Sequence, residues 1–189
     1  MEIRKFLKSG KLILNNLENK IEIANKPATI DFYKISPWEW GLVYEKYVGQ
    51  HLENEGYKVK YNGLELGFLD KGIDLIAENE NCINFIQCKF SKYKIGKSKI
   101  NWILYKASNE LYEHYKSSEK KLIFTLIMNN IQTNISKNTS KKYKLTFTES
   151  SKIKYFWLQY FLDHNHVQDK VKLEFREIFM NNNYSQHRV

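Results

Sequence analysis

Three polar side chains on two strand-like segments have the types and spacing needed for phosphate-ester chemistry. Asp74 lies in the segment Gly72–Ala77, while Gln87 and Lys89 lie in the segment Ile83–Phe90. The short polar stretch between these segments predicts a hairpin loop that joins two antiparallel strands. Because side chains on a strand alternate between its two faces, Gln87 and Lys89 point to the same side of the predicted sheet.

The register of this hairpin decides whether Asp74 joins the pair. In a shorter register Asp74 lies opposite Phe85 and diagonal to Gln87. In a register two residues longer, Asp74 lies directly opposite Gln87. Both registers put Asp74, Gln87 and Lys89 on one face, within about 5–8 Å of one another, whereas an intermediate register sends Asp74 to the other face.

An acid, an amide oxygen and a lysine that converge in this way fit the hydrolysis of a phosphodiester. Asp74 offers a hard oxygen ligand to Mg²⁺, with Mn²⁺ as an alternative, and the Gln87 side-chain oxygen or the Cys88 backbone carbonyl offers another. A metal there polarises the scissile phosphate and lowers the pKa of a bound water. Lys89 can orient or deprotonate the attacking water and offset the charge that develops on the phosphorane.

A helix is predicted from Pro37 to about residue 54, just before this constellation. Ser36 suits the N-cap, Pro37 suits the first helical position, and Glu39 can close a capping box. Gly56 supplies the left-handed residue that ends the helix. These signals together mark a well-defined element.

A carboxylate lies in the middle of the face of this helix that is predicted to pack inward. Trp38, Leu42, Gly49 and Leu52 form the apolar stripe, and Glu45 lies between Leu42 and Gly49 on the same side. An inward-facing acid is unusual in a core, so we expect Glu45 to bind the metal through water or a second ion.

The remaining elements indicate an α/β chain with a mixed sheet. Asn62-Gly63, directly after the strand expected at Tyr57–Tyr61, predicts a turn. The order of helix, three strands, helix and strand over the middle of the chain predicts the mixed sheet. The segments are short strands at Lys20–Ile23 and Ile30–Tyr33, a strand at Tyr57–Tyr61, a helix at Ile100–Tyr115 and a buried strand at Leu122–Met128.

Composition bounds the class of protein and its partner. The chain has 189 residues and a net charge of +9, from 30 Lys and Arg against 21 Asp and Glu, which makes a polyanion the leading partner. Its 42% hydrophobic content excludes a disordered chain, and no apolar run is long enough to span a membrane. With only Cys82 and Cys88, the chain fits a reducing, cytoplasmic location.

A lysine-rich segment follows directly after Lys89. Basic residues with an aromatic among them suit contacts to the phosphates of a nucleic acid backbone. The predicted DNA-binding residues are Lys92, Tyr93, Lys94, Lys97 and Lys99.

Glu45 in a capped helix, then Gly72-Ile73-Asp74, then Gln87-Cys88-Lys89 resembles the PD-(D/E)XK nuclease superfamily. The variant most similar is the Mrr-like restriction endonuclease catalytic domain, whose strand carries Gln-X-Lys. The resemblance covers roughly residues 36–128. It implies a restriction-endonuclease-like fold, with a mixed central sheet flanked by helices, and metal-dependent cleavage of DNA by Glu45, Asp74, Gln87 and Lys89.

Two residues depart from the pattern of the superfamily. Ile73 stands where the motif name has proline, and Mrr-like sequences often lack that proline. Gln87 replaces an acid, which removes one negative ligand and weakens Mg²⁺ binding unless Glu45 compensates.

The chain divides into residues 1–35 as an N-terminal extension, 36–130 as a nuclease core and 131–189 as a C-terminal element. The polar stretch Asn129–Lys142 predicts a loop at the second boundary. The aromatic stretch Tyr155–Leu162 fits either a buried C-terminal helix or a dimer interface, and Asp163–His166 then reads as the end of that helix.

The expected function is therefore a Mg²⁺-dependent DNA endonuclease of the restriction type. A Holliday-junction resolvase or another structure-selective repair nuclease is the first alternative, because that class is small and basic and shares the fold. A non-catalytic DNA-binding module of the same fold is the second, and Gln87 keeps it open. The expected partners are DNA, a second copy of the chain in a homodimer, and a helicase or methyltransferase.

Overall fold

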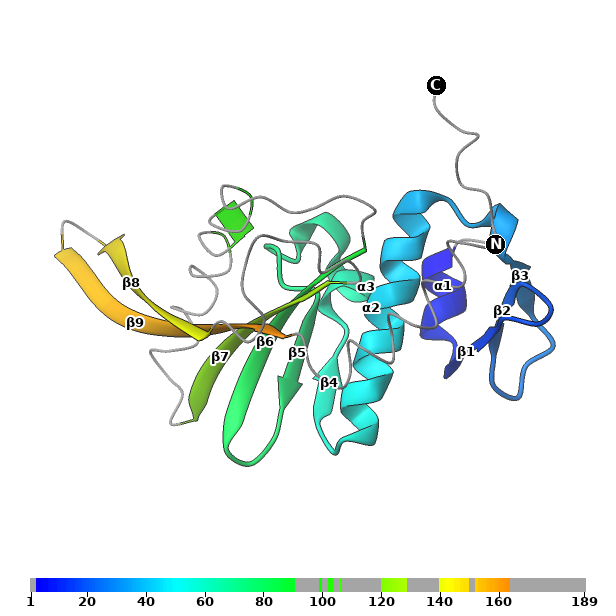
Figure 1. Cartoon of the computed structure of the whole chain (residues 1–189), viewed down its shortest axis with the longest axis horizontal. Helices are drawn as coiled ribbons and strands as arrows, with labels where there is room; N and C mark the ends of the chain where they lie inside the picture. The colour runs from blue at the N-terminus through cyan, green and yellow to red at the C-terminus, as the bar shows by residue number, and fades with distance from the viewer. Residues whose placement is uncertain are drawn as a thin grey trace, which may run out of the picture.

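A computed structural model of the chain describes residues 3–90, 99, 102, 103, 106, 120–128, 140–149 and 152–163 (Figure 1). The helices are α1 (Ile3–Lys8), α2 (Pro37–Asn54) and α3 (Asn62–Leu66), with 3₁₀ turns η1 (Phe32–Lys34) and η2 (Gly67–Leu69). The strands are β1 (Leu12–Asn15), β2 (Lys20–Ile23), β3 (Thr29–Asp31), β4 (Lys58–Lys60), β5 (Leu75–Glu78), β6 (Cys82–Lys89), β7 (Lys121–Met128), β8 (Ser140–Glu149) and β9 (Lys152–Asp163). None of the helices in these ranges is long and apolar enough to cross a membrane.

The strands form two sheets, and α2 runs between them (Figure 1). The small N-terminal sheet has the order β1-β2-β3 and is antiparallel. The larger sheet has the order β4-β5-β6-β7-β9-β8, with β6–β7 and β7–β9 parallel and the other neighbours antiparallel. The predicted α/β class with a mixed central sheet is confirmed.

Helix α2 begins where the sequence predicts. The Glu39 backbone N–H donates to Ser36 Oγ over 3.3 Å, and the Ser36 backbone N–H donates to Glu39 Oε2 over 2.8 Å. These two bonds close the capping box, with Pro37 in the first turn. Gly56 follows the helix with φ of +90°, the left-handed conformation expected of it.

The buried side of α2 is wider than the predicted stripe. Trp38 is 53% exposed, so its assignment to the inward face is wrong, whereas Trp40 is 1% exposed. The buried side of α2 is wide because this helix contacts both the large sheet and α1. The Gln50 side chain also joins α2 to β1, since its Oε1 accepts from the Leu12 N–H over 2.6 Å and its Nε2 donates to the Leu12 carbonyl over 3.0 Å.

The segment between β4 and β5 differs from the prediction. Asn62-Gly63 begins α3, so the predicted turn is wrong. Asn62 is buried, and its Nδ2 donates to the Ile73 carbonyl over 3.1 Å, while the Gly63 N–H donates to the Asp74 carbonyl over 2.8 Å. These bonds bring α3 against the start of β5 and hold Asp74 beside it.

The hairpin of β5 and β6 has the longer of the two registers considered. Leu75 pairs with Ile86 and Glu78 pairs with Ile83. Strand β5 begins at Leu75, three residues later than predicted, because Lys71 and Gly72 have φ of +55° and +83° and form a turn. Asp74 is therefore the last residue before the strand.

The C-terminal part of the sheet corrects another expectation. The aromatic stretch Tyr155–Leu162 belongs to β9, a strand between β7 and β8, so the helix is wrong. A continuous apolar run does not distinguish a helix from a strand with neighbours on both sides. Ser140–Lys142, predicted as loop, lies in β8, whereas β7 confirms the strand predicted at Leu122–Met128.

Candidate active site

Glu45, Asp74, Gln87 and Lys89 all line one cavity of about 310 Å³. Glu45 comes from α2, Asp74 from the residue before β5, and the other two from β6. The structure thus brings together the four residues that the sequence selected. We call this cavity the acidic cavity.

Asp74 is held firmly against β6. It is 5% exposed, and its Oδ2 accepts a hydrogen bond from the Cys88 backbone N–H over 2.6 Å. Burial above all, with a smaller contribution from the nearby Asp70, raises the pKa of Asp74 to about 7, although Lys89 and the Cys88 N–H oppose the shift. A carboxylate in this position gains from any additional positive charge that binds beside it.

Glu45 reaches the cavity from α2. Burial, followed by repulsion from Asp74 and Asp70, raises the pKa of Glu45 to about 9. Its Oε2 is buried and has no hydrogen-bond partner among the described residues. The side chain passes over Gly63, where an added Cβ would lie 2.5 Å from Glu45 Oε2. Sequence reasoning missed Gly63 because Asn-Gly is also a common turn signal.

Gln87 contributes a second unpaired oxygen. The side chain is 7% exposed, and its Oε1 is buried without a hydrogen-bond partner in the described part of the chain. The turn before β5 passes close to it, since an added Cβ on Gly72 would lie 3.7 Å from Gln87 Nε2. Asp70 shapes that turn by accepting the Gly72 N–H at its Oδ1 over 2.8 Å.

These oxygens fit a divalent cation. A buried polar atom without a partner is costly, so two orphaned acceptors in one cavity indicate a missing electropositive group. The residues described here contain no group of three His, Cys, Asp or Glu side chains placed to hold a metal. An ion would therefore need the Gln87 amide oxygen, a backbone carbonyl and water besides the carboxylates, which is the ligand set of Mg²⁺.

Cys88 lies on the other face of β6, as predicted. Its side chain is 5% exposed within the main core, and burial raises the pKa of the thiol well above its usual value. Of Cys88, therefore, the backbone contacts the acidic cavity: its N–H donates a hydrogen bond to Asp74 Oδ2.

Cations and aromatic rings surround the acidic cavity. Of the predicted DNA-binding residues, Lys99 lines the cavity, while Lys92, Tyr93, Lys94 and Lys97 lie outside the described residues. The sequence offered no signal for Arg4, which comes from α1 and donates through Nη1 to the Gly63 carbonyl over 3.2 Å. The further lining residues with cationic or aromatic side chains are Lys71, Lys106, Trp38, Phe68 and Trp102.

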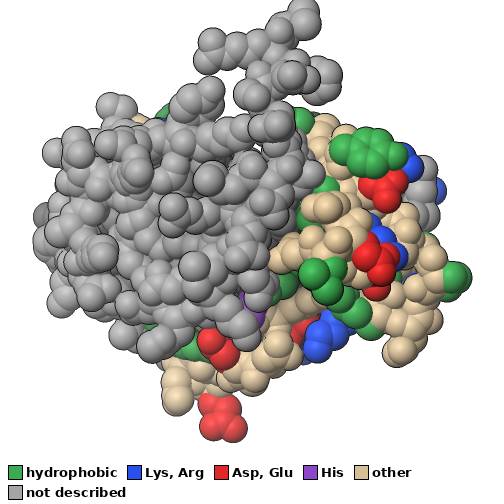
Figure 2. All heavy atoms as spheres, turned by 45° about the vertical axis from the view of Figure 1, so that its right-hand side comes forward, with side chains coloured by type: hydrophobic (Ala, Val, Ile, Leu, Met, Phe, Trp, Pro, Cys, Tyr) green, Lys and Arg blue, Asp and Glu red, His purple; other side chains and the backbone are tan. Residues whose placement is uncertain are grey.

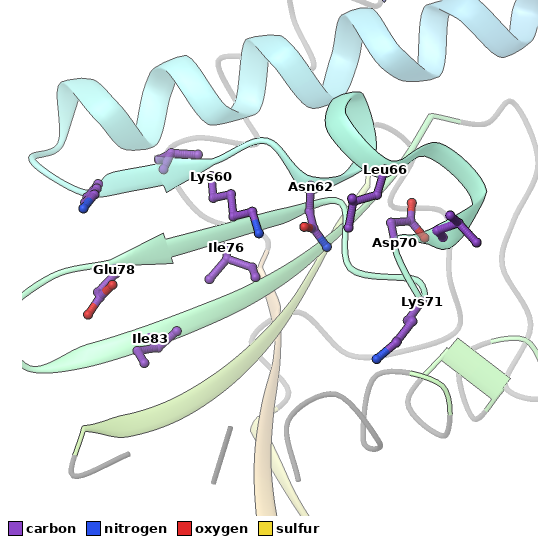
Figure 3. A pocket seen from close by; sticks show the side chains of 11 residues that line it. Lys60, Asn62, Leu66, Asp70, Lys71, Ile76, Glu78 and Ile83 are labelled. Carbon is purple, nitrogen blue, oxygen red and sulfur yellow. The ribbon is translucent and has the colours of Figure 1, made fainter. Parts of the chain in front are cut away.

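A second, larger cavity of about 470 Å³ lies over β4, β5 and β6 (Figure 3). Lys60, Ile76 and Ile83 extend into it from the strands. Asp70 and Lys71 line both cavities, so the turn before β5 stands between them. We call this the strand-face cavity.

The fold and the acidic cavity define an α/β protein with buried carboxylates beside a mixed central sheet. A family model described as restriction endonuclease, that of an Mrr-type catalytic domain, matches residues 56–167, more than half of the chain. The chain belongs to this family, and membership implies a nuclease, which is a hydrolase. No match was found among curated proteins.

The matched segment contains Asp74, Gln87 and Lys89 but begins after Glu45. Glu45 lies outside the matched segment and joins the site through the packing of α2 and its contact with Gly63, which lies inside that segment.

Proposed function

We propose that the chain is a divalent-metal-dependent DNA endonuclease of the restriction type, with Mg²⁺ as cofactor and Mn²⁺ as a substitute. The observation that carries the proposal is the pair of buried, unpartnered oxygens, Glu45 Oε2 and Gln87 Oε1, in one cavity with Asp74 and Lys89. A protein that only binds DNA has no use for such acceptors, since each lowers the stability of the fold.

Asp74, Gln87, Glu45 and the Cys88 backbone carbonyl would hold the ion. When bound, a divalent cation there polarises the scissile phosphate and lowers the pKa of a coordinated water. The hydrogen bond from the Cys88 N–H fixes the Asp74 carboxylate relative to β6, so one ligand is placed before any ion arrives. Gln87 is neutral, and Glu45 supplies the negative charge that an acid at that position would carry.

Lys89 has a different role in the proposal. Its side chain lines the cavity from the same face of β6 as Gln87, beside the two carboxylates whose pKa values it lowers. From there the Lys89 amine can hydrogen-bond the attacking water, accept its proton and offset negative charge on the phosphorane. The cations at the mouth bring the phosphate backbone to these groups.

The test is cleavage of supercoiled plasmid, single-stranded DNA and a four-way junction by the purified protein with Mg²⁺, Mn²⁺ or EDTA. Asp74→Ala and Lys89→Ala are compared with Glu80→Gln, which changes an exposed residue in the hairpin loop. We expect cleavage in Mg²⁺ by the wild type and by Glu80→Gln alone. Cleavage that persists in EDTA or in both site variants contradicts the mechanism.

The same assay addresses the alternatives. Preferential cutting of the four-way junction would favour a structure-selective nuclease, and tight binding without cleavage in either metal would favour a binding module. A homodimer, a helicase or methyltransferase partner and a cytoplasmic location stay predictions from the sequence.

A further inference from the structure

Exposed aromatic side chains gather at the mouth of the acidic cavity. Trp38 is 53% exposed, Phe68 is 92% exposed and Trp102 is 51% exposed, and all three line this cavity. They come from the first turn of α2, from η2 and from a helical residue after the lysine-rich segment. In the described part of the chain, one other large aromatic, Tyr33, is similarly exposed.

This gathering is not required by the fold. On the described part of the face in Figure 2, hydrophobic side chains lie among charged side chains of both signs. Leu17, which is 96% exposed, is such an isolated case. Aromatic rings left in water at a functional cavity indicate a ligand that covers their faces.

Each tryptophan at the mouth has a cation next to its ring. The Arg4 guanidinium lies 5.5 Å from the Trp38 ring centroid, and Lys106 Nζ lies 5.4 Å from that of Trp102. Lys71, Lys89 and Lys99 also line the cavity. A surface that alternates flat rings with positive charge is complementary to a strand that alternates flat bases with phosphates.

We propose, on the basis of the proposed function, that this site acts on DNA whose nucleotides are unpaired and unstacked, with Trp38, Phe68 and Trp102 as stacking platforms for the bases. Rings at the mouth cannot reach the faces of bases inside a continuous duplex, because neighbouring base pairs cover those faces. The site therefore engages a single strand, or nucleotides that have left the stack of a duplex, as in a gap, a flap, a junction or a locally opened stretch of a plasmid. A protein partner on the same rings is the outcome that would overturn the proposal.

The experiment measures binding in EDTA, so that cleavage cannot interfere, by fluorescence anisotropy of labelled 20-nucleotide probes. The probes are a single strand, the same strand with abasic sites through its middle, and the continuous duplex. We expect the wild type to bind the single strand more tightly than either of the others. Phe68→Ala and Trp38→Ala are expected to weaken single-strand binding about 5- to 100-fold and to leave the abasic probe nearly unaffected.

Two further variants distinguish the loss of a stacking ring from a general fault in folding. Phe68→Trp keeps an aromatic face and is expected to bind as the wild type does, whereas Leu17→Ala removes an equally exposed apolar side chain in the turn between β1 and β2. Equal affinity of the wild type for the single strand and the abasic probe overturns the proposal. The proposal also fails if Phe68→Ala behaves like Leu17→Ala.

The outcome for the proposed function is read separately. Asp74-dependent cleavage in Mg²⁺ together with equal binding of the three probes overturns the stacking proposal alone. Base-dependent binding without cleavage in either metal supports the stacking platforms and contradicts the nuclease mechanism alone.

Discussion

The strand-face cavity is larger than the acidic cavity, at about 470 Å³ against 310 Å³, but only the smaller one contains chemically unsatisfied groups. Glu45 Oε2 and Gln87 Oε1 are buried without partners there, and no such atom from the described residues lines the larger cavity. In the strand-face cavity the Glu78 carboxylate has a partner, since Lys120 Nζ lies 2.8 Å from its Oε1. These two buried oxygens without partners, and not the volume of the cavity, therefore distinguish the acidic cavity from the strand-face cavity.

The largest expected effect is a loss of DNA cleavage when side chains of the acidic cavity are removed, with little change when one of the strand-face cavity is removed. Asp74→Ala or Lys89→Ala should reduce the rate of plasmid cleavage at least about 100-fold, because each removes a group that acts on the reacting phosphate or water. Lys60→Ala, in the strand-face cavity, should stay within about threefold of wild type. Initial rates of cleavage at saturating Mg²⁺ measure this difference. Equal losses of rate for variants of both cavities would contradict the assignment of the reaction to the acidic cavity.

Gly63→Ala should displace a side chain of the acidic cavity although it replaces none of the cavity's polar residues. The new Cβ would lie 2.5 Å from Glu45 Oε2 and 3.5 Å from Asp74 Cα, so the Glu45 side chain must move. We expect cleavage to fall about 10- to 100-fold, with a loss of about 1–3 kcal/mol in the free energy of unfolding. Urea denaturation and cleavage assays give the two values.

Gly41→Ala is the matched control for this substitution. Gly41 lies inside α2 with nothing within 4 Å of an added Cβ, so alanine should stabilise the helix by about 0.5–1 kcal/mol at unchanged activity. Full activity in Gly63→Ala would show that the position of Glu45 is unimportant.

The pH dependence of stability should also differ between the two cavities. Folding raises the pKa of Glu45 to about 9 and of Asp74 to about 7, so the metal-free native state binds more protons than the unfolded chain. Its stability should therefore decrease as pH rises from about 5 to 9. Glu45→Gln should flatten this dependence and stabilise the metal-free protein at pH 8 by about 1–3 kcal/mol.

Thermal unfolding in EDTA, repeated with Mg²⁺, measures this prediction. Lys120 lowers the pKa of Glu78 in the strand-face cavity, so Glu78 is ionised in both states above pH 6 and Glu78→Gln should leave the slope unchanged. A melting temperature of wild type that rises with pH over this range would contradict the assignment of buried carboxylates.

Gln87→Glu should produce the smallest change in cleavage, and it tests whether residue 87 is a ligand of the ion. A carboxylate in place of the orphaned amide oxygen adds a negative ligand, so the Mg²⁺ concentration for half-maximal cleavage should fall about three- to tenfold. In EDTA the same variant should melt at a lower temperature than wild type, because three buried carboxylates then repel one another. If the Mg²⁺ requirement of this variant is unchanged, Gln87 is not a ligand of the ion.

Local signals in the sequence were sufficient for α2 and the hairpin. Ser36, Pro37 and Glu39 form their capping box from neighbouring residues, and alternation along β6 places Gln87 and Lys89 on one side. Such features depend on contacts within a few residues, which is why they could be predicted. Two hairpin registers remained open because both place Asp74 on that face, and packing of the sheet selected one.

The sequence by itself determined which side chains could do the chemistry: Asp74, Gln87 and Lys89 on a hairpin, with Glu45 on a capped helix before it. Tertiary structure decided that Arg4 and Gly63 belong to the site, that Trp38 faces its mouth and that the aromatic stretch near residue 160 is a strand. Each of these depends on which segments lie side by side. Contacts between residues far apart along the chain follow from how α1, α2 and the sheet pack together, and no local pattern records that packing.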